Sequence, residues 1–79
     1  MNVTIDYDKL AIGLLDTFTE GDKAAMAFGM IPLAPFNAFL KLVYEEIHKK
    51  GGTALTEGDK EHVEKELSMA LYRNAEMVV

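Results

Sequence analysis

The sequence contains no cysteine, and this absence removes several kinds of site at once. Without thiols the chain cannot form disulfides, hold a metal through thiolates or use a cysteine nucleophile. Serine is almost as scarce, because Ser68 is the only one and falls inside a predicted helix, away from any turn that would present its hydroxyl. Adjacent acids such as Glu45 and Glu46 fit a solvated helix surface. We therefore predict no catalytic residues and a protein that is not an enzyme.

Positive charge is also in short supply. Eight lysines and arginines stand against thirteen aspartates and glutamates, which gives a net charge of −5 and a pI near 4.8. A nucleic-acid binder must neutralise phosphates, and an anionic membrane surface attracts bases, so this charge argues against both partners. A helix-turn-helix DNA reader is disfavoured as well, because the last predicted helix begins with Glu57, Asp59 and Glu61, which would repel DNA.

No hydrophobic run is long enough to indicate a membrane span. The uncharged segment from Ala24 to Leu40 falls short of the roughly 20 residues that a spanning helix needs, and Gly29, Pro32 and Pro35 interrupt it. A turn between two buried helices explains it more simply. The first residues, Met-Asn-Val-Thr-Ile-Asp, lack the basic stretch and apolar core of a secretory signal. We expect a cytoplasmic protein with no membrane partner.

Metal and cofactor motifs are missing too. The loop before the last predicted helix opens with two lysines, where a calcium-binding EF-hand loop needs carboxylates. His48 and His62 lie on different predicted helices, whereas the usual two-histidine zinc motif places them one helical turn apart. Gly51-Gly52 lacks the lysine and hydroxyl residue that follow in a phosphate-binding loop. The sequence predicts no metal site and no cofactor.

A repeated pentapeptide is the most distinctive feature that the sequence does contain. Thr-Glu-Gly-Asp-Lys begins at Thr19 and again at Thr56. Each copy is typical of a helix start, because the threonine hydroxyl can accept from an N–H one turn ahead. The acid three residues later, Asp22 or Asp59, can accept in turn from the threonine N–H. The similarity does not clearly extend beyond the two copies, which favours two separate helix starts over a duplicated unit.

Apolar periodicity predicts four helices in one domain of residues 1–79, which form an all-α compact bundle with tight turns. The second helix is short. The expected helices run from about Asp6 to Phe18, from Thr19 to Met30 or Ile31, from Pro35 to Lys50, and from Thr56 to about Met77.

Three of these helices have one apolar stripe each, and the stripes are the predicted core. Their residues are Tyr7, Leu10, Ala11, Leu14, Leu15 and Phe18, then Phe36, Leu40, Val43 and Ile47, then Val63, Leu67, Ala70, Asn74 and Met77. The second helix is apolar on every side. Such a helix is either central in the fold or covered by a second chain, and because a chain of this length has little interior, the second option is favoured.

Apolar residues of the second helix region and others outside the stripes form a candidate interaction face: Met26, Phe28, Met30, Ile31, Ala38, Leu42, Met69 and Tyr72. Methionine-rich surfaces adapt to partner helices. The sequence thus predicts a small acidic protein-interaction or regulatory module that acts through an apolar helical face. The expected partner is a protein, either unknown or a second copy of the chain, and we expect a homodimer.

Two other functions are compatible with the same residues. The protein could carry a small apolar ligand in a pocket lined by Met26, Phe28, Met30, Phe36 and Phe39. It could also be an acidic inhibitor that occupies a basic site on a target protein, as small proteins of phages and mobile elements do. Size and charge alone support the inhibitor.

Overall fold

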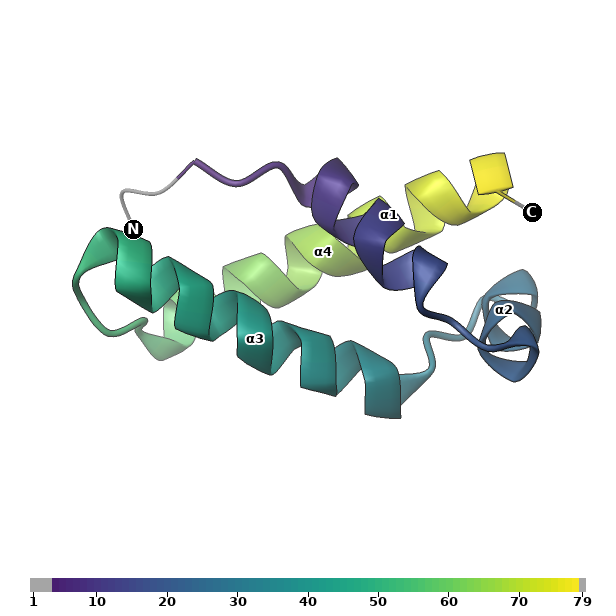
Figure 1. The fold of residues 1–79 in the computed structure, drawn as a ribbon, viewed down its shortest axis with the longest axis horizontal. Helices are drawn as coiled ribbons and strands as arrows, with labels where there is room; N and C mark the ends of the chain where they lie inside the picture. Colours follow the sequence, from purple (N-terminus) through teal and green to yellow (C-terminus); the bar gives the residue numbers. More distant parts are fainter. Residues whose placement is uncertain (1–3, 79) are drawn as a thin grey trace.

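The computed structural model describes the chain over residues 4–78 and the side chains of residues 4–75. Over that range the chain forms four α-helices and no strand, which confirms the predicted all-α bundle (Figure 1). The molecule measures 37 × 21 × 19 Å, with the second helix at one end of the long axis. The helices are α1 (Tyr7–Asp16), α2 (Glu20–Ala27), α3 (Leu33–Gly51) and α4 (Glu57–Val78).

Both copies of the pentapeptide start a helix through the predicted pair of hydrogen bonds. Before α2, the Asp22 N–H donates to Thr19 Oγ1 over 3.2 Å, and the Thr19 N–H donates to Asp22 Oδ2 over 3.0 Å. Before α4, the Asp59 N–H donates to Thr56 Oγ1 over 3.1 Å, and the Thr56 N–H donates to Asp59 Oδ2 over 3.2 Å. Aspartate therefore completes a capping box that more often uses glutamate.

α2 is shorter than predicted because Gly29 ends it. Gly29 adopts φ +79°, a conformation that glycine reaches without steric cost. Its N–H donates to the Met26 carbonyl, and the Met30 N–H donates to the Ala25 carbonyl, each over 2.9 Å. These two bonds form a Schellman motif, which satisfies the last free carbonyls of the helix. The helix therefore ends before Met30 instead of at Met30 or the next residue.

α3 begins earlier than predicted, at Leu33, and Pro35 lies within its first turn. Proline is tolerated there because the first N–H groups of a helix have no partner inside it. At the other end, Gly52 adopts φ +72° and its N–H donates to the His48 carbonyl over 2.9 Å. The glycine pair ends this helix as predicted.

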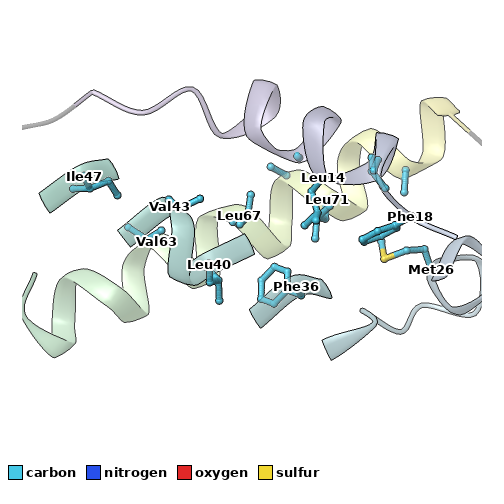
Figure 2. Close-up of a cluster of buried hydrophobic side chains, with 14 residues drawn as sticks. Leu14, Phe18, Met26, Phe36, Leu40, Val43, Ile47, Val63, Leu67 and Leu71 are labelled. Carbon is cyan, nitrogen blue, oxygen red and sulfur yellow. The ribbon is translucent and has the colours of Figure 1, made fainter. Parts of the chain in front are cut away.

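The predicted stripes supply one hydrophobic cluster that runs along the molecule (Figure 2). All four stripe residues of α3 are buried, and so are those of α4 up to Asn74. The stripe of α1 is buried except for Tyr7 and Leu10, which pack against the cluster half-buried. Met77 lies outside the residues whose side chains are described.

The backbones of α1 and α4 come closest to each other. A fully buried alanine on each helix, Ala11 and Ala70, leaves room for this approach, since helix separation depends on the side chains at the contact. α3 presents larger residues to the same core, among them Phe36 and Leu40. Three helices thus enclose the core, and α2 adds to one end of it (Figure 1).

A polar cluster joins the start of α1 to the end of α4. Asp8 Oδ1 accepts from Arg73 Nε over 3.0 Å, from Arg73 Nη2 over 2.6 Å and from Asn74 Nδ2 over 2.8 Å. Asn74, the one polar residue on the α4 stripe, is buried, and its amide also donates to the Ala70 carbonyl over 2.8 Å. The hydrogen bonds from Arg73, and then that from Asn74, hold the pKa of Asp8 below its ordinary value.

Candidate interaction surface

The structure places the eight predicted interaction residues in three environments. One is in the core, since Met26 is only 6% exposed. Ile31 is half-buried against the core. The remaining six are exposed to solvent: Phe28, Met30, Ala38, Leu42, Met69 and Tyr72.

Met26 therefore differs from its prediction as a surface residue. It is the only buried residue of α2, and it reaches the core beside Phe18 (Figure 2). The other apolar residues of α2 are alanines. An exposed alanine leaves only one methyl group in water, so a helix that is apolar on every side needs no cover on every side. The apolar pattern on all sides of α2, which favours cover by a second chain in the sequence analysis, is thus made mostly of alanines that can stay exposed.

Exposed apolar side chains gather instead at the connection between α2 and α3, which we call the apolar turn (residues 28–33). Phe28 and Met30 are 84% and 65% exposed there, and Leu33 is 68% exposed. Leu33 is not among the predicted interaction residues. The predicted third helix begins at Pro35, so Leu33 lies outside every predicted helix and is not assigned to a helix face. The turn divides the uncharged segment, and none of the helices among residues 4–78 is long and apolar enough to cross a membrane.

Hydrogen bonds constrain the main chain of the apolar turn at Gly29 and Met30. Besides the two bonds that end α2, the Gly29 carbonyl accepts from the Tyr72 hydroxyl of α4 over 2.8 Å. Pro32 restricts the backbone directly before α3, where its φ is −68°. The turn presents its three exposed apolar side chains from this constrained backbone. Tyr72, which is 40% exposed, extends the surface onto α4.

The remaining predicted residues are Leu42, Ala38 and Met69. Leu42 lines a groove between α1 and α3, and Ala38 precedes it by one turn of α3. Met69 is exposed on α4 and precedes Tyr72 by three residues, so it borders the surface on that helix. The structure thus brings together Phe28, Met30 and Tyr72 from the predicted face and adds Leu33.

The α1–α3 groove has a volume of about 480 Å³. The segment of residues 4–6 and α1 as far as Gly13 form one wall, and α3 from Phe39 to Lys50 forms the other. Most of its surface is apolar. The apolar residues lining it are Ile5, Leu10, Phe39, Leu42, Val43 and Ile47, and the charged ones are Asp6, Lys9, Glu46 and Lys50.

The pocket predicted for an apolar ligand is not formed. Met26 and Phe36 are buried in the core, whereas Phe28 and Met30 are exposed on the apolar turn. Only Phe39 of those five residues lines the α1–α3 groove. The groove combines stripe residues such as Leu10, Val43 and Ile47 with residues outside the stripes such as Leu42, so no single helical pattern identifies it.

Tyr44 and Asp59, two titratable side chains near the α3–α4 loop, have structural partners. The Tyr44 hydroxyl donates to the Lys60 carbonyl over 3.2 Å, and Lys60 Nζ lies 5.9 Å from the ring centroid. Burial raises the pKa of Tyr44 above its ordinary value, and Glu64 and Glu57 add to this. The backbone hydrogen bond from Thr56 lowers the pKa of Asp59. Among the described residues, no group of three potential metal-ligating side chains comes together.

Comparisons of the chain with protein-family models, curated protein sequences and solved structures found no match. Two surfaces of the molecule are therefore candidates for binding. One is the apolar turn with Tyr72, and the other is the α1–α3 groove.

Proposed function

We propose that the protein is a small, acidic, non-enzymatic interaction module that binds a second copy of itself through the apolar turn. The observation that supports this most directly is the exposure of Phe28, Met30 and Leu33 on a backbone held by hydrogen bonds. Burying a side chain of this size contributes about 1.5–3 kcal/mol. A partner that covers the three therefore gains a substantial part of the free energy that a dimer needs.

The constrained backbone of the turn strengthens the case for binding. Association is weakened when loops and side chains must become ordered at the interface. Here the Schellman bonds and the Tyr72–Gly29 bond already restrict the main chain. Phenylalanine, methionine and tyrosine are also the side chains enriched at the centres of interfaces. The apolar turn has the composition of an interface centre, and hydrogen bonds constrain its main chain at Gly29 and Met30.

The charge distribution favours a second copy as the partner at this surface. Each copy carries −5, so two copies repel each other over most of their surfaces. The segment from Ala24 to Leu40, which contains the apolar turn, has no charged residue. Two copies that meet there face the least local repulsion, and two-fold dimers are the commonest assembly of identical chains.

Sedimentation velocity at micromolar concentration tests this proposal with a matched pair of variants. Met30→Glu and Ile12→Glu each replace an exposed apolar residue by a negative charge, but Ile12 lies on α1 outside the apolar turn. We expect the unmodified chain and Ile12→Glu to sediment as dimers and Met30→Glu to sediment as a monomer. Circular dichroism should show the same helix content in all three. A monomeric unmodified chain at these concentrations would overturn the proposal.

A second variant avoids the introduced charge. Leu33→Ser removes an exposed side chain from the apolar turn and leaves the net charge at −5. If repulsion alone separated the Met30→Glu chains, Leu33→Ser would remain a dimer. We expect it to dissociate more readily than the unmodified chain, because part of the covered apolar area is lost.

A further inference from the structure

Gly13 is placed in the middle of α1 although nothing around it requires a glycine. A Cβ added at this position would meet no atom within 4 Å, and its φ is not positive. Glycine in the interior of a helix is less favourable than alanine, because it loses more backbone freedom on folding. Gly13 lines the α1–α3 groove, so its missing side chain keeps that groove open. A residue such as Gly13, which weakens its helix and is not required by packing, is characteristic of functional positions.

The dimensions of the groove suit a small, narrow ligand. Its volume of about 480 Å³ lies within the range of ligand sites, roughly 300–1,000 Å³. The α3 wall extends from Phe39 to Lys50, which corresponds to about 16 Å at the helical rise of about 1.5 Å per residue. Its apolar surface would contact an alkyl chain along this length.

The charged residues of the groove indicate the sign of the ligand. Its two acids are engaged locally, because Asp6 accepts from the Lys9 N–H over 3.1 Å and Glu46 Oε1 lies 3.7 Å from Lys49 Nζ. Among the side chains of residues 4–75, no carboxylate lies within 4.0 Å of the Nζ atom of Lys9 or Lys50. Two ammonium groups beside an apolar floor are complementary to an anionic head group on an apolar chain.

We propose that the α1–α3 groove binds a free fatty acid, an unbranched alkyl carboxylate. Its alkyl chain lies on the apolar floor between Gly13 and α3, and its carboxylate lies at the lysines that border the groove. This site is separate from the apolar turn, which contributes none of the groove-lining residues. The protein would thus hold an apolar anion on one surface and a second chain on another.

Calorimetric titration with sodium dodecanoate, kept below its micelle concentration, tests the site. We expect one dodecanoate per chain, with amide chemical-shift changes confined to the two walls of the groove. Gly13→Leu should abolish binding while helix content is preserved, because the added side chain enters open space. Dodecyltrimethylammonium has the same alkyl chain and the opposite charge, and we expect it to bind more weakly than dodecanoate.

A charge-matched pair of double variants tests the lysines. Lys9→Gln with Lys50→Gln should weaken dodecanoate binding about tenfold, as expected for the loss of a charge-assisted contact. Lys41→Gln with Lys65→Gln makes the same change in net charge at exposed positions outside the groove, and should bind as the unmodified chain does. Equal losses in the two double variants would overturn the assignment of the lysines.

Two further outcomes would overturn the site itself. Gly13→Leu that binds dodecanoate as tightly as the unmodified chain would show that the ligand lies elsewhere. Loss of binding in Met30→Glu would place the alkyl chain on the apolar turn instead. We expect Met30→Glu to bind dodecanoate with unchanged affinity, since that residue is remote from the groove lining.

Discussion

At the residue scale, one oxygen atom connects the two ends of the described chain. Asp8 Oδ1 accepts three hydrogen bonds, two from Arg73 and one from Asn74. Asn74 is buried, and an unpaired buried amide would be costly, so Asp8 and the Ala70 carbonyl together satisfy it. Every buried side-chain polar atom among the described residues has such a partner.

This cluster predicts how stability depends on pH. The pKa of Asp8 is lower in the folded chain than in the unfolded chain, so its ionised form favours folding. The contribution is complete above the unfolded pKa, about 3.9, and is lost as pH falls through the lower folded pKa. Asp8→Asn should therefore melt below the unmodified chain at pH 7, and the difference should shrink towards zero in acid. Thermal melts of both chains between neutral pH and pH 2 measure this, and a difference that stayed constant would contradict it.

The residues of this cluster show what a sequence can reveal at this scale. Periodicity places Asn74 on the apolar stripe of α4, and the structure confirms that it is buried. Periodicity cannot identify Asp8 as its partner, because the two residues are far apart in the sequence and only the packing of α1 on α4 joins them. Periodicity does not place Met26 in the core, because α2 is apolar on every side and its pattern does not indicate which side is buried.

At the element scale, capping explains where the helices begin. Thr56 should stabilise the chain more than any other threonine, because it caps α4, the longest helix, at 22 residues. We expect Thr56→Ala to lower the free energy of unfolding by about 1 kcal/mol. Urea melts measure the change.

Thr53→Ala provides the control for that substitution. Thr53 is exposed in the preceding loop, and its hydroxyl makes no hydrogen bond within the described part of the chain. The same chemical change there should leave the free energy of unfolding within about 0.5 kcal/mol of its original value. Equal effects of the two substitutions would mean that the cap contributes nothing.

Helix ends were predicted less well than helix starts. The first pentapeptide predicts the start of α2 correctly, because a capping box is formed by residues close together in the sequence. The predicted end at Met30 or Ile31 takes Pro32 as the stop for that helix, whereas in the structure Gly29, three residues earlier, ends it. The Schellman bonds at Gly29 and the Tyr72 hydroxyl together favour the earlier stop, and Tyr72 belongs to a different helix. Because Gly29 ends α2, residues 28–33 lie outside that helix and form the exposed apolar turn.

At the scale of the whole molecule, charge and apolar surface act against each other. Two copies that carry −5 each repel at a distance, whereas the apolar turn attracts at contact. Added salt screens the repulsion, because the Debye length falls to about 8 Å at physiological ionic strength. The dimer should therefore tighten as sodium chloride rises from about 10 to 150 mM. Sedimentation equilibrium at several salt concentrations measures it.

The opposite salt dependence would point to a different partner surface. An interface built on complementary charges weakens when salt is added, as expected for an acidic inhibitor on a basic target. That function stays a prediction from size and charge. The fold class and most of the core follow from periodicity, and Phe28, Met30 and Tyr72 were predicted as surface residues. The groove, and the contact of Tyr72 with the apolar turn, depend on how distant segments meet and could not be predicted.

The hydrogen bond between Tyr72 and Gly29 has a spectroscopic consequence. The chain has three tyrosines and no tryptophan, so tyrosine emission is not masked by a stronger fluorophore. Tyr7 and Tyr44 are half-buried beside the core, and Tyr72 is the exposed tyrosine, which lies at the apolar turn and donates its hydroxyl to the Gly29 carbonyl. The natural chain therefore carries its own optical label at the surface where two copies would meet.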